Sequence, residues 1–409
     1  MSNLPSLLSQ IDTVLKTSRS FDYDHEAFYS QLSHAVMRLD AALWRNPPMT
    51  RAFAALDYLP TLTAVLAKVN CNSKRIPPES KRDPQILCQG HIASSVSNIV
   101  FMLSNTTDLS GYTNRSVALI PALIETQRKY PNYGPISSSS TEFYGEEGRF
   151  RSIRNNIHKT SVHVWEAVTV ATNASIKTTG EYVDILTQPE TLVAFYKTVT
   201  TLMKEESMAG DMPTILRALA DTIGMAVAHC AAYVRTAVSN KEFDMSILFD
   251  YMEKIGYRDA YIAEDCCYLC EVITKHAPHV ATIQLIRAAS KCMRQHVPIN
   301  NPAVLACKRA SAVLINSTYL IPRQDFNQAV MEYGIIELIV RNIDMTAEKM
   351  HNEQVVLLLE RCLWLVSRFS ESSSMRQELL RHGVGHSVRN LKGKVTHPVL
   401  IKWVNSINL

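Results

Sequence analysis

A recurring alternation of helix lengths constrains the fold of this chain more than any other feature. Apolar residues recur at helical spacing, and from residue 57 onward a shorter helix is followed by a turn and then by a longer helix. In the later part of the chain this pair repeats about every 40–50 residues, a period typical of stacked helical repeats. The pattern predicts an all-α protein. Shorter helices are predicted over residues 57–69, 115–128, 190–204, 245–255, 281–294, 334–343 and 383–391, and longer ones over 84–104, 151–172, 212–234, 260–275, 302–320, 353–369 and 398–407.

Two internal copies near the C-terminal end support a repeat. Gln328-Ala-Val-Met-Glu-Tyr-Gly334 is followed by Val-Arg-Asn at 340–342, and Gln377-Glu-Leu-Leu-Arg-His-Gly383 is followed by Val-Arg-Asn at 388–390. The two glycines lie 49 positions apart. A short helix that turns sharply into the next needs a left-handed residue, which glycine tolerates without a steric cost. We therefore predict a tight glycine turn at both positions.

The remaining organisation follows from helix and loop signals. Residues 1–56 are predicted to form N-terminal helices over 4–17 and 25–45 that cap the array, with Asn46-Pro47-Pro48 ending the second. Residues 57–409 are predicted to form the array itself, with polar loop insertions near 71–84 and 130–148. The second insertion contains four consecutive serines at 137–140, which suit either a phosphorylation site or a plain linker.

Charge and hydropathy exclude several protein classes. The net charge of +4 is too small for a nucleic-acid coat, although residues 375–409 hold six cations and one anion. That basic tail suits either a solvated helix face or a docking surface for an acidic partner. The most apolar stretch, residues 213–234, contains Arg217, Asp221 and His229, and no signal peptide is evident. We expect a protein without a membrane span, located in the cytoplasm.

The nine cysteines are odd in number and irregular in spacing, which argues against a disulfide framework and for a reducing compartment. The best metal candidate is Cys267-Tyr-Leu-Cys270, with Cys266 before it and His276 and His279 after it. These cysteines fall on one predicted helix with an apolar pattern, which favours small core residues over a zinc site. No cofactor is predicted.

We find no sequence motif for catalysis. Phosphate-loop, dinucleotide-binding, nucleophile-elbow and His-Glu-x-x-His patterns are all missing from the sequence. His91, His163 and His229 lie on apolar helices, where a histidine with satisfied hydrogen bonds is more common than a general base. We therefore expect a protein that is not an enzyme.

Four long helices contain related five-residue segments. Phe101-Met-Leu-Ser-Asn105 has an aromatic residue, two apolar residues, Ser and Asn, and Trp364-Leu-Val-Ser-Arg368 departs from this pattern only at its last position. Ala312-Val-Leu-Ile-Asn316 keeps the Asn, whereas Trp165-Glu-Ala-Val-Thr169 keeps the aromatic residue. These segments resemble the end of the third helix in the armadillo repeat family, which has an aromatic or apolar residue, two apolar or small residues, Ser and Asn. The resemblance covers most of residues 57–409 and implies a right-handed superhelical solenoid of about seven armadillo- or HEAT-like units.

Partner-binding residues follow from the same resemblance, because importin-α-like members bind extended peptides through ladders of Trp and Asn on the inner helices. The resemblance implies partner-binding roles for Phe101, Asn105, Trp165, Asn316, Trp364 and Arg368. No position here pairs Trp with Asn, and this departure argues against the binding of nuclear-import signals.

A basic helix face adds further candidates. Arg151, Arg154 and His158, together with Asn155 and Lys159, fall at helical spacing on one face of a long predicted helix. The face is either an exposed polar surface or a basic patch that grips carboxylates or phosphates. The second interpretation predicts a partner with an acidic or phosphorylated segment.

These observations favour a scaffold or adaptor that binds a protein segment along a concave helical surface. The alternatives are a regulatory factor for a GTPase or a chaperone ATPase, and an importin-α-like cargo adaptor. RNA binding is disfavoured by the small net charge and the lack of a periodic aromatic–arginine set. Self-association stays open because the terminal unit has no obvious polar cap, and the cytoskeleton and nucleus are alternative locations.

Overall fold

The computed structural model describes residues 4–17, 25–56, 58–70, 84–105, 119–129, 164–172, 180, 182–204, 212–256 and 258–407. Within these ranges the chain consists of helices and connecting turns, and no strand occurs in them. The predicted all-α class is therefore confirmed. The chain divides into two compact units, Met1–Ala237 (unit 1) and Val238–Leu409 (unit 2). The predicted helices over residues 1–56 thus share unit 1 with helices that follow them.

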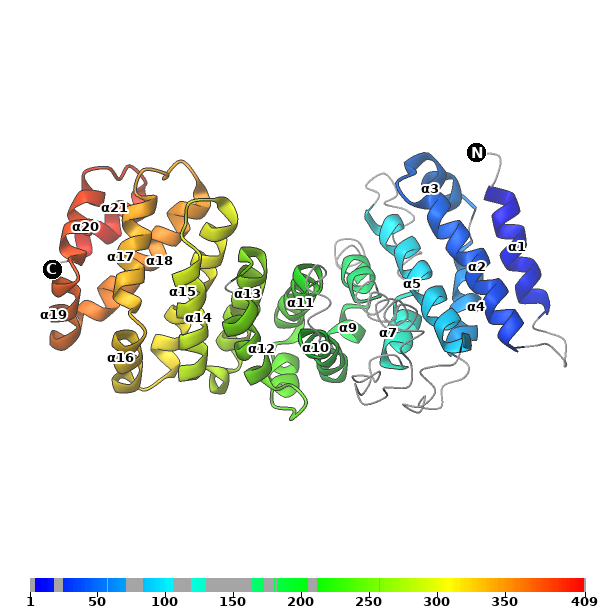
Figure 1. Cartoon of the computed structure of the whole chain (residues 1–409), viewed down its shortest axis with the longest axis horizontal. Coiled ribbons are helices and arrows are strands. Elements are labelled where there is room, and N and C mark those ends of the chain that lie inside the picture. Colours follow the sequence, from blue (N-terminus) through cyan, green and yellow to red (C-terminus); the bar gives the residue numbers. More distant parts are fainter. Residues whose placement is uncertain are drawn as a thin grey trace, which may run out of the picture. The chain divides into compact units, whose positions relative to one another are not determined.

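Unit 1 begins with a packed group of N-terminal helices. Helix α2 packs along α5, α1 packs on α2, and α4 contacts both α5 and α7 (Figure 1). The predicted apolar face of α2 forms the centre of this group, since Phe28, Leu32, Val36, Leu39 and Leu43 are all buried. The helices of unit 1 are α1 (Leu4–Thr17), α2 (His25–Leu43), α3 (Pro47–Ala54), α4 (Leu59–Asn70), α5 (Pro84–Asn105), α7 (Ile120–Lys129), residues 164–172, α9 (Val183–Thr187), α10 (Pro189–Met203) and α11 (Met212–Val238).

The segment after α2 differs from the sequence prediction. Asn46-Pro47-Pro48 ends α2 as predicted, but the same residues also start the short helix α3. The Asn46 side chain accepts a hydrogen bond from the Met49 amide at 3.3 Å, and Pro47 occupies the first helical position, where its missing N–H has no cost. Residues that stop one helix can therefore cap the next.

Helix α11 is long, apolar and bent. Cys230 has extended dihedral angles (φ −155°, ψ 96°) that interrupt the helix. By length and composition alone, α11 is the one helix of the described chain that could cross a membrane by itself. Less than half of its apolar stretch (44%) is buried. The core helix of a soluble protein meets the same criterion, so this feature carries little weight.

Unit 2 consists of two rows of helices. The longer helices α13, α15, α18 and α21 pack side by side in that order, while α14, α17 and α20 contact one another in succession (Figure 1). The elements of unit 2 are α12 (Met245–Tyr251), the π-helix η6 (Met252–Gly256), α13 (Ala260–His276), the 3₁₀-helix η7 (Pro278–Val280), α14 (Ile283–Gln295), α15 (Asn301–Leu320), α16 (Arg323–Glu332), α17 (Ile335–Thr346), α18 (Glu353–Ser370), α19 (Ser373–Arg381), α20 (Val384–Lys392) and α21 (Pro398–Ser406).

Both predicted glycine turns are present. Gly334 joins α16 to α17 with φ 61°, and Gly383 joins α19 to α20 with φ 75°. These left-handed values are costly for residues that carry a Cβ atom. Arg341 of α17 donates to the carbonyls of Met293 and Arg294 and so satisfies the end of α14. The two sequence copies therefore form equivalent helix–turn–helix elements.

The prediction that the cysteines are core residues is confirmed for six of them, which are buried. This group consists of Cys266, Cys267, Cys270, Cys292, Cys307 and Cys362. Burial raises the pKa of the Cys266 thiol, which keeps it protonated. The Cys307 thiol donates to the His296 carbonyl at 2.9 Å. Among the described residues, no group of three or more His, Cys, Asp or Glu side chains is arranged to hold a metal ion.

Candidate functional site

The sequence candidates divide into those outside the described residues and those within them. Arg151, Arg154 and His158 lie outside the described residues, as do both predicted insertions except for Pro84. Phe101 is half-buried near the C-terminal end of α5. Asn105 is the last residue of that helix, and its side chain lies outside the described part.

Trp165 requires a correction, because it does not line a binding surface. Its side chain is fully buried, and its ring stacks on Phe195 of α10 with centroids 4.2 Å apart and an interplanar angle of 5°. The indole Nε1 donates to the Thr198 hydroxyl at 3.4 Å. A buried indole with a stacked ring and a satisfied N–H is a core residue. Trp165 therefore stabilises unit 1 and cannot reach a partner in this structure.

Asn316 of α15 lies on a partly exposed face, but its amide nitrogen is already engaged. Nδ2 donates to the Glu271 carbonyl at 3.0 Å and to the Thr274 hydroxyl at 2.9 Å, both on α13. An Asn side chain has two N–H donors, and these two bonds account for them. Asn316 therefore joins α15 to α13, and only its carbonyl oxygen is left for a partner.

Trp364 and Arg368 form an aromatic cluster with a residue that the sequence did not indicate. Tyr319 of α15 lies against the Trp364 ring at a centroid distance of 5.6 Å and is 65% exposed. The Arg368 guanidinium lies 5.7 Å from the centre of the Tyr319 ring and pairs with Glu371 at 2.6 Å. A cation over an aromatic face is attracted by the ring quadrupole. This cluster presents two aromatic rings and one guanidinium to solvent.

A second cluster surrounds Glu271 of α13. Its carboxylate is 6% exposed and is paired with Arg309 of α15 at 3.0 Å, Arg361 of α18 at 3.3 Å and Lys275 at 3.4 Å. The Arg309 guanidinium also lies 4.1 Å from the centre of the Tyr268 ring. A carboxylate with two oxygens can accept from several donors at once. Glu271 therefore fixes two arginines from neighbouring helices in one orientation.

Both clusters lie on one surface, because their residues are three, four, seven or ten positions apart on α13, α15 and α18. We call this surface the 13–15–18 face. Its members are Tyr268, Glu271 and Lys275 of α13, Arg309, Asn316 and Tyr319 of α15, and Arg361, Trp364 and Arg368 of α18. At about 1.5 Å rise per residue, Arg309 and Tyr319 are separated by about 15 Å along α15.

The cations of this face are more exposed than the carboxylate that they surround. Glu271 is nearly buried, whereas Arg309, Arg361 and Lys275 are 20%, 22% and 53% exposed. The neighbouring Lys308 donates to the Gln354 side chain at 2.6 Å, and its pKa is lowered to about 8 by burial and then by Arg309 and Arg361. Repulsion between neighbouring cations disfavours the charged form. Solvent therefore meets cations, with their carboxylate partner beneath them.

Five residues of this face were not among the sequence candidates: Tyr268, Glu271, Arg309, Tyr319 and Arg361. A signal was present, because Arg309, Asn316 and Tyr319 share one helix face, as do Arg361, Trp364 and Arg368. What was missing was the lateral alignment of the three helices. Only that alignment brings Glu271 to Arg361, which is 90 positions away.

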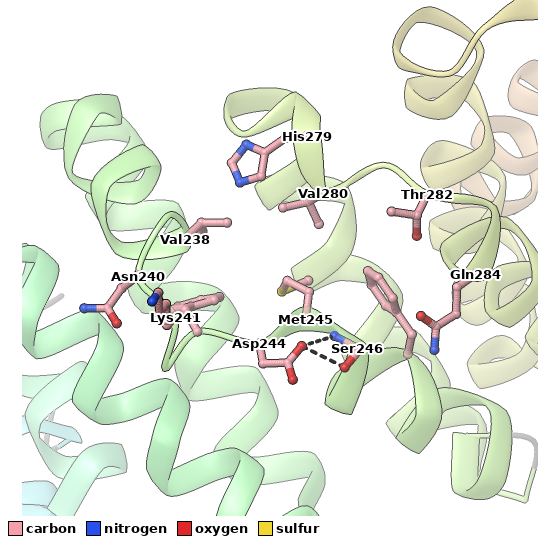
Figure 2. A pocket seen from close by; sticks show the side chains of 12 residues that line it. Val238, Asn240, Lys241, Asp244, Met245, Ser246, His279, Val280, Thr282 and Gln284 are labelled. Atoms are coloured by element: carbon pink, nitrogen blue, oxygen red, sulfur yellow. Dashed lines mark hydrogen bonds between the residues drawn. The ribbon is translucent and has the colours of Figure 1, made fainter.

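A separate depression of about 340 Å³ lies in unit 2 near α12. Figure 2 shows its side chains, including Asp244, which accepts from the amide and hydroxyl of Ser246 at 3.0 and 2.7 Å. The apolar floor (Val238, Phe243, Met245, Phe249 and Val280) is buried, and the rim is polar. The Asp244 contacts cap α12, so the polar group best placed in this depression already has a structural role.

Unit 1 contains one further polar cluster. Asp184 accepts from the Tyr233 hydroxyl at 3.1 Å and lies 3.2 Å from Nε2 of His229. The hydrogen bond with His229, followed by that with Tyr233, lowers the pKa of Asp184. His229 is thus paired, consistent with a histidine whose hydrogen bonding is satisfied. The cluster joins α9 to α11.

Comparison with known proteins leaves the chain without an assigned family. No protein-family model matches it, and no curated protein matches it significantly. The 13–15–18 face must therefore be interpreted from its own chemistry.

Proposed function

We propose that this protein is a non-enzymatic adaptor that binds a segment of another protein on the 13–15–18 face. The observation that carries the proposal is the cluster of the exposed Tyr319 with the half-buried Trp364 and Arg368. Aromatic residues and arginine are enriched at the energetic centres of protein interfaces, because they bury large areas and retain a polar group. An exposed tyrosine braced by a tryptophan and an arginine is already ordered, which lowers the entropy cost of binding.

The same proposal includes an architecture. We infer an armadillo-like right-handed solenoid of about seven units, in which each longer helix contributes to a continuous concave surface. The side-by-side order of α13, α15, α18 and α21 and the equivalent glycine turns before α17 and α20 support this arrangement in unit 2. An extended segment that lies along α15 can contact side chains of the neighbouring helix α18 as well. A cytoplasmic location accords with the buried free thiols.

Quantitative capture from a lysate of the native cells tests the proposal. Wild-type protein, Tyr319→Ala and Trp364→Ala are used as baits, with Trp44→Ala as the matched control, because Trp44 is a 48% exposed aromatic residue in unit 1. We expect a small set of proteins to be reduced about tenfold or more by both face variants and unchanged by the control. Captured proteins that all three variants retain equally would refute the assignment of this face.

Circular dichroism and thermal unfolding of each variant guard against a trivial loss of structure. Tyr319 and Trp364 are at least partly exposed, so truncation should cost little stability compared with truncation of a core residue. A variant that unfolds at the wild-type temperature but loses its partners identifies a binding defect.

A further inference from the structure

We propose that the segment bound by the 13–15–18 face is acidic and bipartite: one carboxylate binds at Arg309 and Arg361, and an apolar side chain about one to five residues away packs on Tyr319 and Trp364. The inference rests on the proposed function, since it specifies the partner of the same face. It is carried by the positions of two clusters of different chemistry on one rigid surface.

The arginine cluster has donors to spare. A guanidinium has five N–H donors. Arg309 uses one of them on Glu271, and Arg361 uses two, on Glu271 and on the Lys308 carbonyl. The Nε of Arg309 is buried without a hydrogen-bond partner. Because Glu271 already holds both guanidiniums in place, an incoming carboxylate meets a preorganised pair.

Local charge favours a single negative group. Lys275, Arg309 and Arg361 surround Glu271, while Lys308 interacts with Glu264 and Arg361 with Glu360. These groups comprise four cations and three anions, so one positive charge is uncompensated. A carboxylate would neutralise it, whereas a phosphate dianion would reverse its sign. Glu264 and Glu271 are nearly buried, so an approaching ligand meets the cations first.

The spacing follows from helix geometry. Arg309 and Tyr319 are separated by about 15 Å along α15, and Arg361 and Trp364 by about 4.5 Å along α18. Because an extended peptide advances about 3.3 Å per residue, the carboxylate and the apolar residue are about one to five positions apart in the bound segment. Tyr319 and Trp364 offer aromatic faces rather than a deep cavity, which suits Leu, Met or an aromatic side chain.

Phage display of random dodecapeptides against the full chain tests the inference. We expect enriched sequences that carry Asp or Glu and an apolar residue about one to five positions apart. One enriched peptide is then synthesised with a fluorescent label, together with its Glu→Gln (or Asp→Asn) and phosphoserine counterparts. We expect the amide peptide to bind about tenfold or more weakly, and the phosphoserine peptide to bind no more tightly than the acidic one.

Variants of the protein locate the carboxylate. Arg309→Gln should weaken the acidic peptide about tenfold or more but leave the amide peptide unchanged, and Arg309→Lys should have an intermediate effect because it keeps charge but loses the planar fork. Arg287→Gln is the control, because Arg287 is a 49% exposed arginine that pairs with Glu253 at 2.8 Å outside this face. It should bind both peptides as the wild type does.

Several results would overturn the inference: no enriched peptide, enriched peptides without acidic residues or without the predicted spacing, tighter binding of the phosphoserine peptide, or equal binding by wild type and Arg309→Gln. The proposed function can survive each of these. If Trp364→Ala still loses its cellular partners while the selected peptides are not acidic, the face binds protein and only the chemistry of the partner is wrong. If Trp364→Ala captures the same partners as the wild type, both the proposed function and this inference are wrong.

Discussion

Replacing Glu271 by Gln provides the sharpest test of how unit 2 is held together. The substitution keeps the shape of the side chain and one carbonyl acceptor but removes the negative charge. Three cations, Lys275, Arg309 and Arg361, then face one another around a neutral group. Removing one member of a largely buried charge network leaves its partners uncompensated, which is more costly than the loss of a surface pair.

The magnitude follows from the exposure of each partner. The pair with Lys275 is an i,i+4 pair with a half-exposed cation and contributes up to about 0.5 kcal/mol. Each arginine bond contributes about 1 kcal/mol, after allowance for the exposed part of the guanidinium. We therefore expect Glu271→Gln to destabilise unit 2 by about 2–3 kcal/mol. The double variant Glu271→Gln/Arg309→Gln should lose less than the sum of the single variants, with a coupling of about 1 kcal/mol.

Hydrogen exchange of the amides in α13 and α15 measures the loss of stability in unit 2 directly. It does not require the two units of the chain to unfold in one cooperative transition. Because about 1.4 kcal/mol corresponds to a factor of ten, exchange there should be about 30- to 150-fold faster in Glu271→Gln. The matched control is Glu253→Gln, whose partner Arg287 is half exposed, and it should cost about 0.5 kcal/mol or less. Equal effects of the two substitutions, or strictly additive losses in the double variant, would refute the reasoning.

Two further predictions concern unit 1 and the glycine turns. Burial raises the pKa of Asp40 from 3.8 to about 6, although Asn98 donates to its carboxylate at 3.3 Å. The folded state then holds this proton more tightly than the unfolded state. The protonated Asp40 therefore contributes its whole stabilisation below about pH 4, and the free energy of unfolding falls by about 3 kcal/mol as the pH rises through 6. Asp40→Asn should remove this fall and be more stable above pH 6, as measured by urea unfolding from pH 4 to 7; an unchanged pH dependence would contradict it. Gly383→Ala should cost about 1 kcal/mol from its positive φ alone, because a Cβ atom there meets nothing within 4 Å. Gly334→Ala should lose more stability than Gly383→Ala, because its Cβ atom would lie 3.0 Å from the Arg294 side chain and 3.1 Å from the Glu337 side chain. Thermal unfolding of both variants measures the two losses. Equal losses would show that these side chains move away from the Cβ atom without cost.

Local sequence signals predicted the longer helices well, because helix ends and amphipathic faces are set by neighbouring residues. Thr282 and Asn300, for example, accept hydrogen bonds from the first-turn amides of α14 and α15. The predicted turns at Gly334 and Gly383 are likewise confirmed by their positive φ angles. The short helices α9, α16 and α19 were not among the predicted ranges. The start of α3 was missed because Asn46 and Pro47 carry signals for both the end and the beginning of a helix.

The candidate site was predicted less well, because exposure depends on what packs beside a helix. Trp165 and Trp364 occupy similar places in the sequence pattern, yet the first stacks on Phe195 in the core and the second borders the exposed Tyr319. Nothing in either local segment distinguishes them, because an apolar ring suits a core and an interface alike.

By itself, the sequence determined an all-helical chain with glycine turns at Gly334 and Gly383 and thiols suited to a core, because those properties depend on periodicity, capping and side-chain size. Only the tertiary structure decided which polar residues form a site. Glu271, Arg309 and Arg361 belong to three helices, and their meeting depends on the lateral register of α13, α15 and α18. That register is set by the packing of whole helix faces rather than by any short segment, so the face appears only when the helices are assembled.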